Sequence, residues 1–287
     1  MSTIPPERDP LPASEPREAH QAREIAESFG SDAERYDRTR PHYPQALVER
    51  IVAASPVPAG SGYARSGPYV LDVGCGTGIA ARQFLAAGCR VLGVEPDVRM
   101  ADFARQSGVE TEMAKFEDWD SVGREFDTVI AGQAWHWVDP VAGAAKAAQI
   151  LRPGGRLALF WYVFQPPADL AEAFAAVYGR VLPGTPFSRG TMPGLDAYST
   201  FFTKAADGMR QAGGFGEAEQ WRYDWDLPYT REEWLDVVPT SGGHSQFPAG
   251  KLEELMAGIG AAIDAVGDNF TMRYTAVAVT APRASSD

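Results

Sequence analysis

Three glycines at alternate positions follow an apolar run in the stretch Val70-Leu-Asp-Val-Gly-Cys-Gly-Thr-Gly78. This pattern predicts a buried strand that turns sharply into a helix, because glycine tolerates a left-handed backbone and lets a ligand approach the main chain. The free N–H groups at the start of that helix carry partial positive charge and suit a polar ligand. A dinucleotide-binding loop would place its third glycine one residue later. A nicotinamide-dependent oxidoreductase is therefore the less favoured alternative.

A carboxylate, Glu95, ends the next apolar run, Val91-Leu-Gly-Val-Glu95. In nucleotide-binding folds an acidic residue at this strand end accepts hydrogen bonds from the ribose hydroxyls. Its place one strand after the glycine loop favours this role over that of a solvated surface charge. The loop and Glu95 together predict a site for a nucleoside-containing ligand at the carboxyl edge of a sheet.

The elements that must position these residues alternate between short apolar runs and helical stretches, which is typical of a mostly parallel sheet with helices on both faces. We expect strands over Tyr69–Val73, Arg90–Val94, Val109–Ala114, Asp127–Gly132, Arg156–Tyr162, Glu217–Leu227 and Phe270–Thr280. We expect helices over Gln21–Phe29, Asp32–Asp37, Gln45–Ala54, Ile79–Ala87, Val98–Gln106, Glu117–Val122, Val141–Leu151, Thr230–Val238 and Gly250–Val266. A turn over Arg152-Pro-Gly-Gly155 should separate one of these helices from the strand that follows it.

The chain divides into three predicted segments. Residues 1–20 are rich in proline and charge, which predicts a disordered leader rather than a signal peptide. Residues 21–68 predict an N-terminal helical lid that ends in a proline- and glycine-rich loop. Residues 69–287 predict the main domain, with a helical cap inserted over about residues 164–216, where acceptor specificity should be encoded.

Charge and composition bear on the partners and the location of the protein. The 287 residues carry a formal net charge of −12 and no run of basic side chains, which disfavours nucleic acid and anionic membranes. No apolar stretch approaches the roughly 18 residues of a membrane span. The two cysteines form neither a disulfide framework nor a zinc site, so we expect a cytoplasmic protein without a metal. A small-molecule partner is favoured, and the oligomeric state is not predicted.

The glycine loop, with Asp72 before it, resembles the first motif of the class I S-adenosylmethionine-dependent methyltransferases, in which this loop wraps the methionyl part of the cofactor. The resemblance extends to Met100, Lys115-Phe-Glu117, Ala131-Gly-Gln-Ala-Trp-His-Trp-Val-Asp139 and Tyr36-Asp-Arg-Thr-Arg-Pro-His-Tyr-Pro44. These stretches are similar to the small-molecule branch that includes methyltransferase type 11-like proteins and trans-aconitate methyltransferase. The resemblance implies an α/β fold with a Rossmann-like, doubly wound, seven-stranded and mostly parallel sheet, an antiparallel last strand and a helical cap.

The resemblance also implies which residues form the site. The cofactor S-adenosyl-L-methionine is expected to contact Tyr36, Arg40, Asp72, Gly74, Cys75, Gly76, Gly78, Glu95, Pro96, Met100, Phe116, Glu117 and Gln133. The acceptor is expected to contact Tyr43, Trp135, Trp137, Trp161, Tyr162 and His244. Plain packing is the alternative for Tyr36 and Tyr43, and a surface charge is the alternative for Arg40. Lys115 replaces the acidic residue that the family often has there, so the adenine amino group would contact backbone or Glu117.

Methyl transfer from a sulfonium is an in-line displacement, so orientation of donor and acceptor can supply much of the catalysis. His136 follows the fourth strand and is the candidate general base for a hydroxyl or amine acceptor, with a capping or core position as the alternative. A carboxylate acceptor would need no base. The sequence thus predicts methyl transfer to O, N or C of a small organic molecule, such as a secondary metabolite or a carboxylic acid.

Two further alternatives remain open to different degrees. A protein that binds S-adenosylmethionine without transferring its methyl group fits the same motifs. Methylation of protein or RNA is disfavoured by the negative charge. It is also disfavoured because Gln133-Ala-Trp-His136 stands where an Asn/Asp-Pro-Pro-Tyr type motif would be expected.

Overall fold

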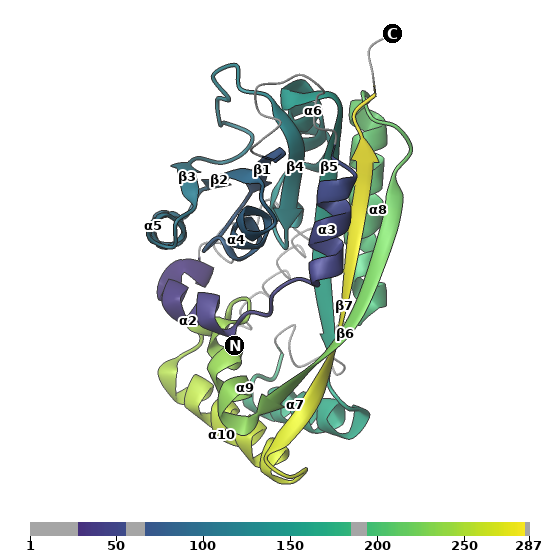
Figure 1. Ribbon diagram of the computed structural model, residues 1–287. Helices are drawn as coiled ribbons and strands as arrows, with labels where there is room; N and C mark the ends of the chain where they lie inside the picture. Colours follow the sequence, from purple (N-terminus) through teal and green to yellow (C-terminus); the bar gives the residue numbers. More distant parts are fainter. Residues whose placement is uncertain (1–27, 56–66, 185–193, 285–287) are drawn as a thin grey trace, which may run out of the picture.

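A computed structural model describes residues 28–55, 67–184 and 194–284. At its centre is a seven-stranded sheet in the order β3-β2-β1-β4-β5-β7-β6, in which β7 runs antiparallel to both of its neighbours (Figure 1). The strands are β1 (Tyr69–Val73), β2 (Arg90–Glu95), β3 (Glu110–Met113), β4 (Phe126–Gly132), β5 (Leu151–Gln165), β6 (Glu219–Thr230) and β7 (Asn269–Pro282). This topology confirms the predicted mostly parallel sheet with an antiparallel last strand.

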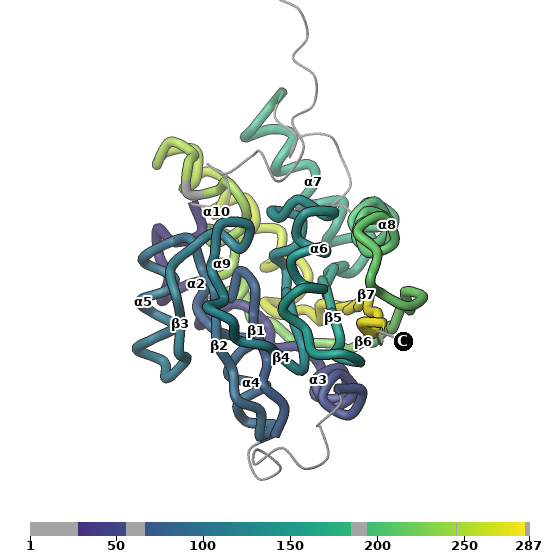
Figure 2. Tube along the Cα trace, turned by 90° about the horizontal axis from the view of Figure 1, so that it is seen from above, coloured from purple at the N-terminus to yellow at the C-terminus, as the bar shows by residue number. Residues whose placement is uncertain are grey.

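Helices cover both faces of the sheet. Helices α3 (Gln45–Ala53) and α4 (Ile79–Ala86) lie on one face, and α6 (Pro140–Ile150) and α8 (Leu195–Ala212) lie on the other (Figure 2). Each face has its own cluster of buried apolar side chains, so the sheet is covered on both sides as a mostly parallel sheet requires. Helix α5 (Val98–Gln106) packs against β2 and β3.

Several of these helices begin at an acidic or hydroxyl residue that accepts hydrogen bonds from the first turn. The Asp97 carboxylate accepts from two main-chain N–H groups of α5, and Asp139 does the same for α6. Thr230 and Glu233 form a reciprocal capping box at α9 (Arg231–Val237). Such caps satisfy N–H groups that would otherwise lack a partner, and they fix where each helix starts.

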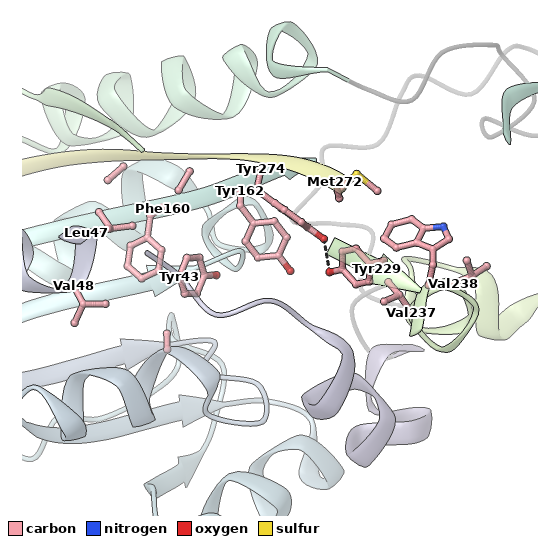
Figure 3. Close-up of a cluster of buried hydrophobic side chains, with 14 of the residues drawn as sticks. Tyr43, Leu47, Val48, Phe160, Tyr162, Tyr229, Val237, Val238, Met272 and Tyr274 are labelled. Carbon is pink, nitrogen blue, oxygen red and sulfur yellow. Dashed lines mark hydrogen bonds between the residues drawn. The ribbon is translucent and has the colours of Figure 1, made fainter. Parts of the chain in front are cut away.

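The strands β5, β7 and β6 are 15, 14 and 12 residues long and extend well past the four shorter strands. At their far end they carry a helical cap of α7 (Ala168–Val181), α9 and α10 (Ala249–Asp264), which form the lower half of the molecule in Figure 1. The predicted cap over residues 164–216 contributes only α7, because α8 lies on the sheet and α9 and α10 come later in the chain. An apolar cluster joins this cap to the sheet, and inside it the hydroxyls of Tyr229 and Tyr274 lie 2.8 Å apart (Figure 3).

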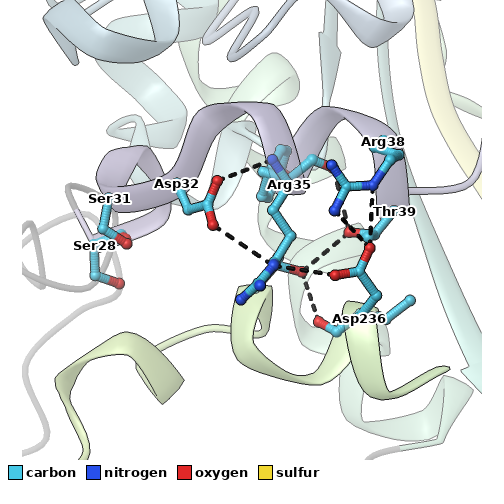
Figure 4. Close-up of polar contacts among 10 residues, drawn as sticks. Ser28, Ser31, Asp32, Arg35, Arg38, Thr39 and Asp236 are labelled. Carbon is cyan, nitrogen blue, oxygen red and sulfur yellow. Dashed lines mark hydrogen bonds and ion pairs between the residues drawn. The ribbon is translucent and has the colours of Figure 1, made fainter. Parts of the chain in front are cut away.

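A short helical segment at the N-terminal side of the described chain packs against the cap. It consists of η2 (Phe29–Asp32) and α2 (Ala33–Thr39). Arg35 and Arg38 of α2 both form ion pairs with Asp236 of α9, at 3.1 and 2.7 Å (Figure 4). This segment, called the lid below, falls within the predicted lid of residues 21–68, whereas α3 of that prediction lies on the sheet. Residues 1–27, with the predicted leader and most of the first predicted helix, lie outside the described residues.

Two sequence predictions of local structure are wrong. The stretch Glu117–Val122 contains no helix, because the Asp120 carboxylate accepts a hydrogen bond from the Val122 N–H and the chain turns there with a positive φ of 51°. Strand β5 starts at Leu151 rather than after the Pro-Gly-Gly turn, because Leu151 already pairs with Phe126 of β4 before the register shifts. Its other end reaches Gln165 because β7 is long enough to pair with it.

Candidate functional site

A cavity of about 620 Å³ lies at the carboxyl ends of β1, β2 and β4. The glycine loop, the lid, the chain after β4 and the cap all contribute to its wall. The predicted site residues that line it are Tyr36, Arg40, Tyr43, Asp72, Gly74, Cys75, Gly76, Glu95, Pro96, Met100, Phe116, Glu117, Gln133, His136, Trp137, Tyr162 and His244. The predicted residues Gly78, Trp135 and Trp161 are not part of this wall.

The glycine loop after β1 adopts backbone conformations that other residues rarely adopt. Gly74, Gly76 and Gly78 have φ angles of +65°, +57° and +87°. A side chain at Gly74 would place its Cβ 2.6 Å from the Cβ of Ala134, so the loop could not lie against the chain after β4. Gly78 instead forms the N-cap of α4, where it packs on the neighbouring helix and not against the cavity.

Two buried carboxylates form one end of the cavity. Neither oxygen of Asp72 has a hydrogen-bond partner among the described residues, although the residue is only 1% exposed. Burial, reinforced by the charge of Glu95, raises the pKa of Asp72 to about 8. Glu95 accepts hydrogen bonds from the N–H groups of Gly76 (2.8 Å) and Asp97 (2.9 Å), yet burial still raises its pKa to about 7. A buried carboxylate without a partner is costly, so this end of the cavity suits a cationic ligand.

The lid brings a cation to the same cavity. The Arg40 guanidinium lies 4.8 Å from the centre of the Tyr36 ring and donates a hydrogen bond to the carbonyl of Thr240. No described carboxylate pairs with it. The lid is also tied to the glycine loop, because Arg82 of α4 binds the Asp37 carboxylate at 2.6 Å and donates to the carbonyl of Thr77 at 2.8 Å.

His136 lies on the short helix η3 (Trp135–Trp137) after β4, and the side chains of Trp161 and Phe201 contact its imidazole. The indole Nε1 of Trp161 donates a hydrogen bond to its Nδ1 at 3.2 Å. The ring of Phe201 stacks on the imidazole, with centroids 4.9 Å apart and an angle of 15° between the planes. Burial lowers the pKa of His136 to about 4, so the side chain is neutral at physiological pH.

His244, expected to contact the acceptor, is buried in the cap with 2% of its surface exposed. Its Nε2 is 2.9 Å from the Tyr178 hydroxyl, and its Nδ1 is 3.1 Å from the carbonyl of Ser241. Because a carbonyl only accepts, Nδ1 carries the proton and Nε2 accepts from Tyr178. Burial lowers the pKa of His244 to about 4.

The main chain after β4 is strained where it meets the cavity. Gln133 has a φ of +56°, and its side-chain amide donates to the carbonyl of Tyr162 at 3.0 Å. Gly132, just before it, leaves room for Tyr43, since a Cβ there would lie 2.7 Å from the tyrosine hydroxyl. Backbone strain of this kind costs about 1–3 kcal/mol and is common at functional sites.

Apolar side chains that follow β2 and β3 in the chain line the part of the cavity away from the cap. Met100 and Phe116 are almost fully buried there, and Pro96 and Lys115 complete the wall. Glu117 accepts a hydrogen bond from the main-chain N–H of residue 139, at 3.2 Å. A flat aromatic ligand group fits such a surface.

Comparisons with known proteins agree with this geometry. Residues 71–159 match the model of a methyltransferase domain, type 11. An uncharacterised methyltransferase from Mycobacterium tuberculosis is 36% identical over 160 residues, which is 55% of this chain and 61% of the relative. A malonyl-[acyl-carrier protein] O-methyltransferase from Pectobacterium atrosepticum is 28% identical over 54% of this chain and 59% of its own length. The match thus spans about three fifths of these curated relatives.

Among solved structures, a chain assigned as a type II methyltransferase from Anaeromyxobacter dehalogenans shares the fold with a TM-score of 0.60. It is 22% identical, over 86% of this chain and 99% of that chain. The glycine loop, Glu95 and the strand order all lie within this shared framework. Residues 71–159 are therefore similar to a methyltransferase domain, and the chain shares the fold of this solved methyltransferase. The predicted relation to trans-aconitate methyltransferase stays a prediction.

The cavity also includes residues that the sequence did not point to. Tyr178 of α7 and Tyr198 of α8 line it, both from the insertion in which specificity was expected but without a motif of their own. Asp97 lines it too, and its helix-capping position after Glu95 is a signal that could have been used. Trp135 and Trp161, predicted to contact the acceptor, are buried in the cluster on the far face of the sheet.

The described residues hold no group of three or more histidine, cysteine, aspartate or glutamate side chains that could bind a metal ion. Within the same residues, no helix combines the length and the apolar character needed to cross a bilayer. Cys75 and Cys89 are both buried free thiols.

Proposed function

We propose that the cavity binds S-adenosylmethionine and that the protein methylates a small organic molecule, with a carboxylic acid as the acceptor that the site supports best. The observation that carries the cofactor assignment is Asp72, a buried carboxylate without a partner, beside a glycine loop that a side chain would obstruct. The amino-acid tail of the cofactor supplies an ammonium group for that carboxylate. The residues present therefore fit the cofactor that the family uses.

Each part of the cofactor has a counterpart in the cavity wall. The main chain of Gly74, Cys75 and Gly76 would hold the tail, and Arg40, which lacks a carboxylate partner among the described residues, would pair with its carboxylate. Glu95 would accept from the ribose hydroxyls, since each of its oxygens keeps a second lone pair. Pro96, Met100, Phe116 and Glu117 would enclose the adenine, and Tyr36 and Gln133 would complete the site.

The part of the cavity next to the cap, where the acceptor would bind, is called the acceptor half below. It contains no described group that is free to take a proton. His136 has Nδ1 occupied by the indole of Trp161, and His244 has both ring nitrogens occupied. An alcohol or a protonated amine must lose a proton to react, whereas a carboxylate need not. When a carboxylate oxygen forms its bond to the methyl group and the S–CH₃ bond breaks, both charges are lost and no proton is released. Tyr43, Trp137 and Tyr162 would surround such an acceptor.

The Pectobacterium relative is described as an O-methyltransferase, which agrees with a reaction at oxygen. The net charge of −12 supports a small molecule rather than a nucleic acid as the acceptor. The two unpaired cysteines support a location in the cytoplasm.

Isothermal titration calorimetry with S-adenosylhomocysteine tests the cofactor assignment. We expect micromolar binding that is lost in Gly74→Ala. Mass spectrometry of a panel of small carboxylic acids and matched primary alcohols, incubated with the protein and S-adenosylmethionine, then tests the acceptor class. We expect a gain of one CH₂ on acids and none on the alcohols. Absence of binding heat would overturn the cofactor assignment, and methylation of alcohols alone would overturn the acceptor class.

A further inference from the structure

We propose that Trp161 is a positioning residue that locks His136 in the tautomer with its proton on Nε2, so that His136 donates a hydrogen bond to the acceptor and does not act as a general base. This inference rests on the proposed function for the role of the donor, but the tautomer itself follows from contacts within the chain. It replaces the base role that the sequence suggested for His136.

The donor–acceptor chemistry of the pair leaves one arrangement. An indole N–H can only donate, so the His136 Nδ1 that lies 3.2 Å from Trp161 Nε1 must be unprotonated. A neutral imidazole then carries its proton on Nε2. No described residue forms a hydrogen bond with Nε2, and His136 lines the cavity. The imidazole therefore presents an N–H group to a ligand.

The pair is rigid because both rings are packed from the same side. Trp161 is 1% exposed, and its ring lies 5.6 Å from that of Phe202. Phe201 stacks on both partners, with its centroid 4.9 Å from the His136 ring and 6.4 Å from the Trp161 ring. A 180° turn of the imidazole about its Cβ–Cγ bond would keep this stacking but would put a carbon opposite the Trp161 Nε1 and lose the hydrogen bond, so the indole selects the ring orientation and the tautomer that the ligand meets.

The strand register explains why these two residues meet. Gly132 of β4 pairs with Phe160 of β5, and the main-chain N–H of Gln133 donates to the carbonyl of Phe160 at 2.9 Å. Phe160 and Tyr162 face the cluster on the cavity side, and Trp161 between them faces the opposite cluster. The alternation of side chains along β5 thus places Trp161 against His136 and Tyr162 in the cavity wall, where the acceptor would bind.

A second histidine in the same cavity has the opposite tautomer, which shows that the choice is local. His244 donates from Nδ1 to a carbonyl and accepts at Nε2 from Tyr178. Its two nitrogens are satisfied inside the cap, whereas His136 keeps one N–H for a ligand. For a carboxylate acceptor, the His136 N–H would hold one oxygen while the other attacks the methyl group.

The tautomer is measured directly by two-bond ¹H–¹⁵N spectra of the full chain with ¹⁵N-labelled histidine, saturated with S-adenosylhomocysteine at pH 7. We expect His136, assigned by its loss in His136→Gln, to show a protonated Nε2 and an unprotonated Nδ1. In Trp161→Phe we expect a mixture of tautomers, because no indole N–H then holds Nδ1 unprotonated. A protonated Nδ1 in the wild type, or an unchanged spectrum in Trp161→Phe, overturns the proposal. Trp221→Phe, which removes an indole bond to Glu219 outside the cavity, should leave the His136 signals unchanged.

Two substitutions at His136 separate a donor from a base. The amide of glutamine can donate from about the place of Nε2 but cannot accept a proton at neutral pH. In the carboxylic-acid assay we expect His136→Gln to retain most of kcat and His136→Ala to lose roughly 100-fold, the effect of one missing donor. Equal losses in both variants would show a base and overturn the proposal. The spectra need no acceptor, so a failure of methyl transfer would overturn the proposed function and leave the tautomer readable.

Discussion

The two halves of the cavity place charge in opposite ways. The half at β1 and β2 holds two buried carboxylates, Asp72 and Glu95, whose pKa values burial raises to about 8 and 7. The half under the cap holds two histidines that are neutral because burial lowers their pKa values to about 4. One half holds acidic groups that a cationic ligand would ionise, and the other presents neutral hydrogen-bonding groups. The predictions below test this division.

The largest effect is expected at the glycine loop. Gly74→Ala would combine a φ of +65° with a Cβ 2.6 Å from Ala134. We expect a loss of about 2–4 kcal/mol in the free energy of unfolding and at least a roughly 100-fold loss of S-adenosylhomocysteine affinity. Gly88→Ala is the matched control, because Gly88 has a φ of +86° but open space around it. It should cost about 1 kcal/mol and leave binding intact, by denaturation and calorimetry. Equal binding in both variants would remove the loop from the site.

The next effect concerns the pH dependence of stability. The raised pKa of Asp72 means that between about pH 4 and 8 the folded protein binds more protons than the unfolded chain, so the free energy of unfolding falls as the pH rises. We expect Asp72→Asn to reduce this fall in urea denaturation, since Glu95 contributes in the same direction. Asp102→Asn, at an exposed ion pair, should keep the wild-type slope. An unchanged slope in Asp72→Asn would show that Asp72 is ionised in the free protein.

Ligand binding gives a second measure of the protonation state of Asp72. An ammonium group that pairs with Asp72 requires the ionised form, so S-adenosylhomocysteine binding at pH 7 should release protons. Calorimetry in two buffers with different enthalpies of ionisation measures this release. The release should decrease in Asp72→Asn, and a wild type that releases none would place the ammonium elsewhere.

Arg40 tests where the division between the halves lies. If it pairs with the cofactor tail, Arg40→Met should lower the affinity for S-adenosylhomocysteine by roughly 10-fold and leave 5′-methylthioadenosine, which lacks the tail, unaffected. Arg38→Met, which removes an exposed arginine of the same helix, is the control for damage to the lid. Equal affinity losses for both ligands, or for neither, would move Arg40 out of the cofactor half.

The smallest effect is expected at the contact between lid and cap. Asp236→Asn removes the carboxylate shared by Arg35 and Arg38, and because the pairs are exposed to solvent it should cost little stability. We expect the dissociation of S-adenosylhomocysteine, followed by stopped flow, to become a few fold faster. Asp264→Asn breaks a comparable pair with Arg231 away from the lid and should leave dissociation unchanged. An unchanged dissociation rate in Asp236→Asn would show that the contact between lid and cap does not limit ligand release.

The sequence predicted the cofactor half in detail because its function depends on backbone shape. Glycines at fixed spacing and an acid at a strand end have only a few structural explanations, and the structure places Gly74, Gly76, Asp72 and Glu95 around one cavity. These residues lie close together in the chain, so local patterns were sufficient to find them. Their contacts with a cofactor stay predictions.

The acceptor half was predicted less well because its residues meet through tertiary packing. Trp161 and Trp135 were expected to face the acceptor, but the alternation along β5 and the packing of η3 bury them on the other face. Tyr178 and Tyr198 reach the cavity from helices that carry no motif. The partner of a histidine nitrogen depends on the register between β4 and β5, and a single sequence does not reveal that register.

The long strands β5 and β7 restrict how the molecule can admit its ligands. They pair continuously from Arg156 to Gln165, so the cofactor half and the cap share one unbroken ladder of main-chain hydrogen bonds. A hinge rotation between the two halves would have to break that ladder. Movement of α2 would break only its partly exposed ion pairs with α9. We therefore expect ligand exchange to depend on movement of the seven-residue helix α2, which can change its rate without altering the frame that positions the reacting groups.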